Sequence, residues 1–236
     1  NLLTGEVLMF KKATRSTSKL KLALTGPSGS GKTYSALQIA KGLVPGGKYA
    51  VIDTENGSAS LYSGRGVAFD VAEMHSPFLT EKYIQAIKAA EAAGYDVLII
   101  DSLSHAWNGE GGLLQQKEQL DARGGNSFTN WAKVTPKHEA FTAAILQANI
   151  HIIATMRSKQ DYVLQDNGKG KQAPIKVGLA PVQREGLEYE FTTVLDIAMD
   201  HGAQASKDRT GIFNTIRQLS EKDGEALAKW LKGEEN

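Results

Sequence analysis

The chain has 236 residues, of which 41% are hydrophobic and 22% charged, and its formal net charge is +1. This composition predicts one soluble globular protein, and a charge so close to zero excludes a surface that is basic as a whole, so nucleic-acid binding would need a local basic patch. The absence of cysteine excludes disulfides, thiol catalysis and cysteine metal sites. No apolar run is long enough to span a membrane and the first residues lack a secretory pattern, so we expect a cytoplasmic protein with no membrane partner.

The first expected elements surround a glycine-rich loop. Residues 20–24 alternate as in a strand, and residues 32–42 carry helix-forming side chains, so the loop connects a strand to a helix. A second, buried strand is expected at 49–53. This order is typical of the beginning of an α/β domain.

The middle of the chain continues the same alternation. A helix is expected to begin with Thr80 as its cap, and an apolar strand follows that ends at Asp101. A further helix is expected to open at Thr135–Pro136, before a strand over 151–155. Strands that are apolar on both faces and separated by helices predict an α/β fold with a mainly parallel central sheet flanked by helices.

The pattern changes after residue 178. The segments "EFTTVLDIAM" and "GIFNTIRQL" are strand-like without a long helix between them, which predicts a C-terminal antiparallel hairpin extension. Ser220 and Asp223 match a capping box before a short final helix. We therefore expect an N-terminal arm over 1–18, a core over 19–217, and a C-terminal helix and tail over 218–236.

The glycine-rich loop matches GxxxxGK[ST] in full. In that motif backbone N–H groups and the helix N-terminus surround phosphates, the lysine neutralises the terminal phosphates, and the hydroxyl of Thr33 would hold Mg²⁺. A glycine–serine turn without function is the alternative, which the flanking strand and helix disfavour. The expected nucleotide contacts are Gly26, Pro27, Ser28, Gly29, Ser30, Gly31, Lys32, Thr33 and Tyr34.

Acidic residues end the two strands that follow the loop. Asp101 is expected to reach the Mg²⁺ ion from beside the loop. Because Ser102 follows it instead of a second acid, the group that orients the attacking water must come from elsewhere, and Glu55 is the candidate. Asp53 is expected to hold either the loop or metal-bound waters. Glu55 and Lys32 are thus the expected catalytic residues of this site.

Two other nucleotide-dependent classes fit the sequence poorly. GTPases usually carry DxxG and a later NKxD. The stretch "RSKQD" at 157–161 imitates the second motif, but Ser158 stands where asparagine or threonine belongs. Neither Asp53 nor Asp101 begins a DxxG. Nucleotide kinases need an arginine-rich lid, and no such cluster of arginines is evident.

The loop, Glu55 after the second strand and Asp101 before a serine together resemble the RecA/RadA group of ATPases. The resemblance implies that Tyr62 contacts adenine and that "IIATMRSK" leads into a DNA-binding loop. Thr155 aligns there with the usual phosphate-sensing glutamine, a departure from the pattern, while Arg157 and Lys159 keep basic positions.

A closer resemblance covers residues 10–232. "IDTENGSASLY", "IIDSLSHAWNGEGG", "IIATMRSKQDY", "QREGLEYEF" and "SKDRTG" are similar to segments of phage-encoded RecA-like ATPases of the single-strand annealing and recombination group. That resemblance implies ATP, Mg²⁺, single-stranded DNA and a homo-oligomeric ring or filament in a bacterial host cell, with a single-stranded-DNA-binding protein as a further partner.

Two segments are candidates for contact with a second copy. "SKDRTG" resembles the hairpin with which RecA-like neighbours supply cations, so Lys207 and Arg209 are expected to act in trans, or else to form a solvated basic turn. Phe10 and Ala13 match the FxxA form by which some RecA relatives dock an N-terminal arm, although a phenylalanine packing on its own core is the simpler interpretation.

The basic stretch 157–178 is expected to be a flexible loop that binds single-stranded DNA through phosphate contacts and aromatic stacking. An ordinary solvated lysine loop is the alternative. Trp107 or Trp131 would belong to a second DNA loop, unless both are simply buried. The expected DNA contacts are Arg157, Lys159, Tyr162, Lys169, Lys171 and Lys176.

Three functions remain open from the sequence. The first is an ATPase that assembles on single-stranded DNA and promotes annealing or strand pairing. The second is a ring-shaped helicase or translocase, and the third is a nucleotide-gated module that binds another protein.

Overall fold

Strand β1 (Lys21–Gly26) lies inside a mostly parallel sheet in the computed structural model, which describes residues 12–166 and 172–234, with the side chains of 160–179 excepted. Within that part of the chain the strands are hydrogen-bonded in the order β3-β2-β4-β5-β1-β7-β8-β9, and β6 pairs with β5 outside this path. Neighbours from β3 to β7 are parallel, whereas β8, β9 and β6 pair antiparallel. The predicted α/β class with a C-terminal antiparallel part is confirmed. The remaining strands are β2 (Tyr49–Asp53), β3 (Asp70–Glu73), β4 (Val97–Asp101), β5 (His151–Asp166), β6 (Gln172–Pro181), β7 (Thr193–Ile197), β8 (Gly202–Asp208) and β9 (Arg217–Gln218).

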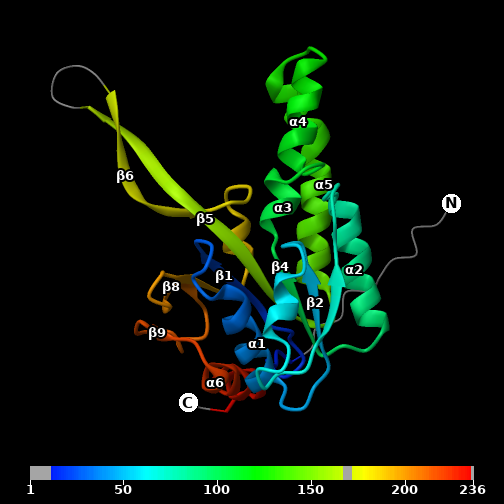
Figure 1. The fold of residues 1–236 in the computed structure, drawn as a ribbon, viewed down its shortest axis with the longest axis vertical. Coiled ribbons are helices and arrows are strands. Elements are labelled where there is room, and N and C mark those ends of the chain that lie inside the picture. Colours follow the sequence, from blue (N-terminus) through cyan, green and yellow to red (C-terminus); the bar gives the residue numbers. More distant parts are fainter. Residues whose placement is uncertain (1–11, 167–171, 235–236) are drawn as a thin grey trace.

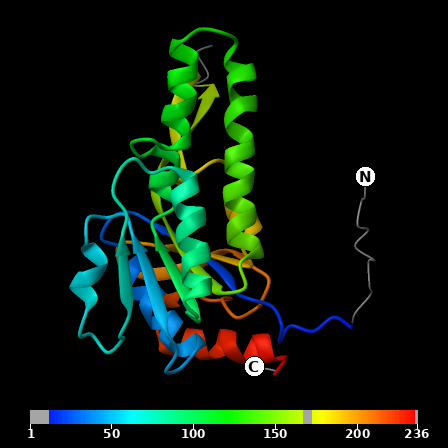
Figure 2. The same cartoon turned by 90° about the vertical axis from the view of Figure 1, so that its right-hand side faces the viewer.

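Helices cover both faces of the sheet (Figures 1 and 2). Leu22 and Leu24 belong to a core that includes α1 (Lys32–Leu43) and α6 (Glu221–Lys232). Ala23, between them on β1, belongs to the second core with α2 (Thr80–Ala92) and α5 (Ser127–Gln147). Because successive strand residues point to opposite faces, these strands must be apolar throughout, as the sequence is.

Helix α6 packs closely on α1 because two glycines meet. A Cβ atom built on Gly224 would lie 2.2 Å from the carbonyl oxygen of Ile39, and one on Gly42 would lie 1.9 Å from that of Glu221. The predicted capping box of Ser220 and Asp223 is present at the start of α6.

Helix α5 begins earlier than predicted. The side chain of Asn126 accepts a hydrogen bond from the N–H of Phe128 at 2.8 Å, so the helix begins at Ser127 and Pro136 lies inside it. The prediction of a start at Thr135–Pro136 was wrong because an asparagine after the paired glycines 124–125 caps the helix well ahead of that proline. At α2 the cap position is Leu79, and Thr80 is the first helical residue.

The segment before α5 is also helical. It forms α3 (Ser104–Asn108), which carries Trp107, and α4 (Leu113–Ala122), which pairs with α5 in a projecting hairpin (Figure 1). The rings of Trp107 and Trp131 stack on each other with centroids 5.7 Å apart. Both tryptophans therefore lie on helices instead of the expected loop, half-buried against one another as in the other interpretation, and contact of either one with DNA stays a prediction.

Strand β5 continues beyond the sheet as half of a second projection. Its first part pairs with β1 and β4, and from Ser158 on it pairs with β6 to form a two-stranded arm that leaves the body of the molecule (Figure 1). The expected flexible loop over 157–178 was therefore wrong for residues 157–166 and 172–178, where short runs that contain β-branched or aromatic residues, such as "YVL" and "PIKV", pair as strands. Within the described ranges, no helix is both long and apolar enough to cross a membrane.

The contact between α1 and α6 generates a stability prediction. Gly224→Ala should lower the free energy of unfolding by about 1–3 kcal/mol, because the added methyl group has no space, even though alanine favours a helix by about 1 kcal/mol. Chemical denaturation measures the difference, with Lys229→Ala on the exposed side of α6 as the control. A Gly224→Ala variant as stable as that control would contradict the close packing.

Candidate functional site

The glycine-rich loop bends from the end of β1 into the first turn of α1. Gly31 has φ +92, a left-handed conformation that favours glycine, and a Cβ atom there would lie 3.2 Å from Nδ1 of His201. That histidine contacts the carbonyl oxygen of Ser30 at 2.9 Å and so braces the loop from the turn between β7 and β8. Two features therefore require glycine at position 31, the left-handed backbone conformation and the close approach of His201.

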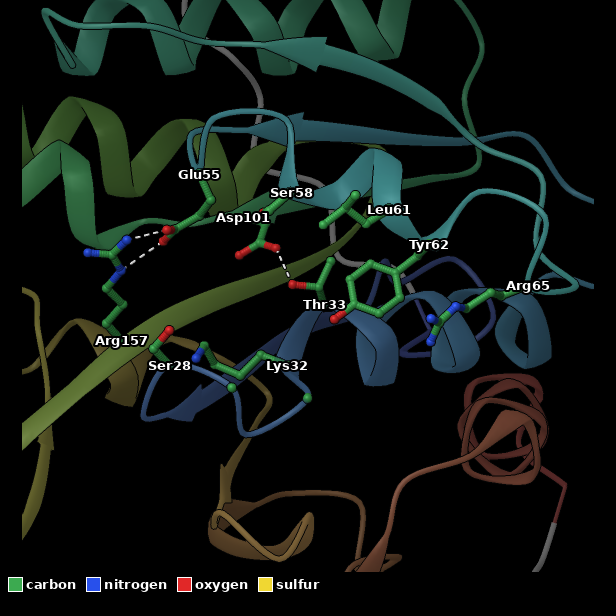
Figure 3. Close-up of a pocket in the computed structure, with 12 residues that line it drawn as sticks. Ser28, Lys32, Thr33, Glu55, Ser58, Leu61, Tyr62, Arg65, Asp101 and Arg157 are labelled. Atoms are coloured by element: carbon green, nitrogen blue, oxygen red, sulfur yellow. Dashed lines mark hydrogen bonds and ion pairs between the residues drawn. The ribbon is translucent and has the colours of Figure 1, made fainter.

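A pocket of about 360 Å³ lies beside this loop (Figure 3). It brings together residues from the loop, from the segment after β2, from the end of β4 and from the middle of β5. Three of its lining residues, Ser58, Leu61 and Arg65, were not singled out in the sequence. The lining residues are Ser28, Gly29, Gly31, Lys32, Thr33, Glu55, Ser58, Leu61, Tyr62, Arg65, Asp101 and Arg157.

Lys32 is nearly buried at the bottom of the pocket. Its Nζ donates to the carbonyl oxygens of Gly26 at 2.9 Å and Pro27 at 2.8 Å. Burial lowers the pKa of Lys32, and the charges of Asp101 and Glu55 oppose that shift. The ammonium group is thus held on its own loop by neutral carbonyls, which a more negative ligand can replace.

Asp101 is a buried carboxylate that both neighbouring elements bind. Its Oδ2 accepts a hydrogen bond from Thr33 at 2.5 Å and its Oδ1 accepts one from Thr155 at 2.5 Å. Burial raises the pKa of Asp101, and the two hydroxyl hydrogen bonds oppose the rise. Thr33 and Asp101, the two residues predicted to hold Mg²⁺, therefore touch each other.

These oxygens suit a magnesium ion that arrives with a nucleotide. No cluster of three or more histidine, cysteine or acidic side chains that could hold a metal occurs in the described part of the chain. Mg²⁺ commonly binds to one or two protein oxygens and completes its shell with water and phosphate oxygens. The pair Thr33–Asp101 fits that kind of site.

Two other predicted contacts make bonds of a different kind. Asp53 is buried, and its carboxylate accepts the backbone N–H groups of Glu55 at 2.6 Å and Ala59 at 2.8 Å, so it holds the loop, one of the two roles expected for it. Thr155 lies outside the pocket lining and bonds to Asp101. Their predicted contacts with metal waters and nucleotide stay predictions.

Glu55 faces the pocket from the loop after β2, and Arg157 holds it there (Figure 3). The guanidinium of Arg157 donates to both carboxylate oxygens, from Nε at 2.8 Å and from Nη2, and Ser102 Oγ donates to the first oxygen at 3.3 Å. Burial alone would raise the pKa of Glu55, but the hydrogen bonds and charge of Arg157 outweigh it and lower this pKa. The residue predicted to orient water is therefore ionised and already bonded.

His105 contacts Thr54, the residue before Glu55, and was not predicted as part of the site. Its Nδ1 is 2.7 Å from Oγ1 of Thr54, and its ring stacks on Phe78 with centroids 4.8 Å apart. Burial lowers the pKa of His105. Nothing local in "DSLSHAW" indicates this position, because the partner Thr54 is distant in the sequence.

A second cavity of about 330 Å³ adjoins the first on the side of Tyr34 and Tyr62. The two tyrosine rings lie 6.0 Å apart, and the guanidinium of Arg65 lies 5.4 Å from the centre of the Tyr62 ring. Both cavities share Gly29, Gly31, Tyr62 and Arg65. Tyr62, the predicted adenine contact, and Tyr34, a predicted nucleotide contact, therefore line a cavity that is continuous with the phosphate loop.

Lys207 lies near the end of β8 and Arg209 just after it, away from the glycine-rich loop. Lys207 pairs with Val194 of β7, and Val194 pairs with Ala23 near the start of β1, whereas the glycine-rich loop follows the end of β1. The ammonium group of Lys207 donates to the carbonyl oxygen of Tyr189. Neither cation lines the pocket of its own chain, so any role in that pocket would require a second copy.

The predicted DNA contacts gather on the arm. Lys159 is exposed at its base, while Tyr162 and Lys176 are backbone register partners in the ladder between β5 and β6. Lys169 and Lys171 lie outside the described residues. Arg157 stands apart from this group because its side chain turns into the pocket.

The hydroxyl of Thr155 provides a test of the Asp101 geometry. Thr155→Val should lower the free energy of unfolding by about 1–3 kcal/mol, because it leaves one oxygen of a buried carboxylate without its donor. Thr155→Ser is the matched control, since it keeps the hydroxyl. Equal stability of the two variants in chemical denaturation would contradict the hydrogen bond.

Comparison with known proteins identifies the family. A family model described as AAA domain matches residues 18–223, and the chain therefore belongs to the AAA domain family. A search of curated proteins gave no match. Membership implies a P-loop NTPase, which agrees with the loop, the lysine and the pair Thr33–Asp101 described above.

Proposed function

We propose that this AAA-domain protein hydrolyses ATP to ADP and phosphate, assembles with copies of itself and binds single-stranded DNA through the β5–β6 arm. The proposal of ATP hydrolysis rests on one observation. One pocket is lined by Lys32, Thr33, Asp101 and Glu55. Lysine and Mg²⁺ offset the charge of the terminal phosphates, and a carboxylate accepts the proton of the attacking water. Glu55 is the acid in this pocket that is not engaged with Thr33.

The adjoining cavity supports ATP as the nucleotide. Tyr34, Tyr62 and Arg65 offer aromatic faces and a cation beside the phosphate loop, a surface on which a purine base can stack. The resemblance to RecA-like ATPases assigns the base contact to Tyr62.

Self-assembly is supported by what surrounds the pocket. Leu61 at its lining is 77% exposed, and Met199 beside the loop is 62% exposed. Large apolar side chains at the mouth of a polar site suit coverage by another chain. A second copy that covered this mouth would also bring Lys207 and Arg209, which cannot serve their own pocket.

The surface at strand β3, at the other end of the sheet from β9, is where we propose that the Phe10–Ala13 segment of a neighbouring copy docks. All four residues of the edge strand β3 are exposed, and a largely apolar cavity of about 260 Å³ opens between β3, β2 and α2. An exposed edge strand beside an apolar hole can accept an extended segment with one large side chain. Phe10 lies outside the described residues, and its docking on a neighbouring copy is part of this proposal.

DNA binding is supported by the shape and sequence of the arm. It projects from the body, carries Lys159 at its base, and its sequence supplies Lys169, Lys171 and Lys176. Cations along an extended element with an aromatic residue suit a single strand. Annealing or strand pairing, as in the phage RecA-like group, is the activity we favour over translocation, because residues 10–232 resemble that group.

One observation favours the alternative of a nucleotide-gated module that binds another protein. Phe128 lies in the first turn of α5, near the end of the projecting α4–α5 hairpin, and is 82% exposed. An exposed aromatic side chain on a projection is typical of a protein contact. ATP hydrolysis that is indifferent to DNA would favour this alternative.

The first functional prediction concerns Glu55. Glu55→Gln should lower the rate of ATP hydrolysis by about 10²–10⁴-fold while a fluorescent ATP analogue still binds, because only the proton acceptor is lost. Lys32→Ala should lose binding as well. Unchanged phosphate release by Glu55→Gln would exclude it as the base.

A second functional prediction tests whether the pocket is shared between two copies of the chain. Arg209→Ala should lower hydrolysis by about 10³–10⁵-fold with nucleotide binding intact, as expected for a cation supplied in trans. An equal mixture with Glu55→Gln should recover turnover, because one variant supplies the arginine to the intact pocket of the other. Arg123→Ala, on the α4–α5 turn, is the control. A mixture without recovery would count against the shared site.

The third concerns DNA. Lys169→Glu with Lys171→Glu should weaken binding of a single strand and reduce the slope of log K against log salt by roughly 1.4, since each lost phosphate contact removes about 0.7. Lys88→Glu with Lys222→Glu changes the net charge equally at distant surfaces. The same salt slope in both pairs would remove the arm from the DNA site.

A further inference from the structure

His201 occupies a tight turn between β7 and β8. Its backbone N–H donates to the carbonyl oxygen of Ala198 at 3.0 Å, and the carboxylate of Asp200 accepts the N–H of Gly202 at 2.9 Å. The backbone of His201 has φ +68, a left-handed conformation that is uncommon for a residue other than glycine. Such a conformation persists where the surrounding contacts require it. The turn therefore places the imidazole ring at a defined position beside the phosphate loop.

The bond to the phosphate loop determines what each nitrogen of the His201 ring can do. Nδ1 lies 2.9 Å from the carbonyl oxygen of Ser30. Because a carbonyl oxygen can only accept, Nδ1 carries the proton, and Nε2 of the neutral ring is then an acceptor. The ring atoms nearest to a Cβ atom built on Gly31 are Nδ1, Cε1 and Cγ, so Nε2 lies on the side away from this glycine. His201 therefore offers one acceptor to a ligand beyond the loop.

His201 lines the second cavity but not the phosphate pocket. The same is true of Gln218, whereas Tyr62 and Arg65 line both. The amide nitrogen of Gln218 donates to the carbonyl oxygen of Asp200 at 3.4 Å, which leaves Oε1 as its group for a ligand. The wall that His201 and Gln218 form therefore offers two acceptors, while the guanidinium of Arg65 lies over the Tyr62 ring, 5.4 Å from its centre.

A purine base in this cavity would meet that wall with its edge. Its phosphates would lie in the first pocket and its face on Tyr62, which lines both cavities. Adenine carries an amino group at its position 6, which donates, whereas guanine carries an oxygen there, which accepts. Two acceptors in the wall satisfy the amino group and leave the oxygen of guanine without a donor. Stacking alone makes no such distinction, because every base has an aromatic face.

We propose that His201 is a specificity-determining residue whose Nε2 accepts the 6-amino group of adenine, so that the site selects ATP over GTP. Gln218 supports the same choice from β9, and Ser30 enforces it, because the proton that Ser30 holds on Nδ1 keeps Nε2 an acceptor. This inference rests on the proposed function and names the part of the nucleotide that the site distinguishes. It gives the turn between β7 and β8 a second role besides bracing the phosphate loop.

The test measures displacement of a ribose-labelled fluorescent ATP analogue from the full chain by ATP, GTP and ITP. ITP keeps the oxygen at position 6 but lacks the 2-amino group of GTP, so it isolates the contact at position 6. The wild type should bind ATP about tenfold more tightly than either of the others, the worth of one hydrogen bond against an unpaired acceptor. In His201→Asn, which suits the left-handed turn but has a shorter side chain, the three affinities should approach one another. His201→Phe, which keeps a ring without its nitrogens, should give the same result.

Controls separate recognition of the base from bracing of the loop. Tyr62→Ala should weaken all three nucleotides equally, because stacking is common to all purines. His75→Phe, at an exposed histidine outside both cavities, should behave as the wild type. His201 variants that weaken all three nucleotides by the same factor would leave the histidine as a brace only and overturn the inference, as would a wild type that binds GTP or ITP as tightly as ATP. Failure of the ATPase proposal itself would look different, since the wild type would then select ATP without releasing phosphate.

Discussion

The buried carboxylate of Asp101 is the contact on which the site depends. It ends β4, and its two oxygens accept the hydroxyls of Thr33 at the start of α1 and of Thr155 on β5. Because β5 lies between β1 and β4 in the sheet, the acid could not reach the phosphate loop by direct strand pairing. The two threonines bridge that gap, and a buried charge without them would carry a large desolvation cost.

Strand β5 is shared by the central sheet and the arm. Its first residues are fully buried between β4 and β1, and its later residues form the arm. The core holds this strand at one end, and the other end projects from the body of the molecule. The chemistry of the pocket and the position of the arm therefore share a covalent element, whichever ligand the arm binds.

Much of the fold and part of the site could be predicted from local sequence. The phosphate loop is a contiguous motif. Glu55 follows the end of β2 by two residues and Asp101 ends the neighbouring parallel strand β4, so both lie at one edge of the sheet. The start of α5 and the arm were mispredicted, since an asparagine cap and short runs of β-branched or aromatic residues are weak local signals beside a proline or a lysine-rich stretch. The ion pair between Glu55 and Arg157 joins residues 102 positions apart, and no local pattern encodes such a contact.

The length of the arm determines how far its outer end moves when its base tilts. Residues 158–166 extend about 30 Å beyond the junction at the usual rise of ~3.3 Å per strand residue. A tilt of about 10° at the base would then swing the far end by about 5 Å, by simple leverage along a strand of that length. A small change of orientation at the base of the arm would in this way become a displacement of its far end comparable to the spacing between successive nucleotides.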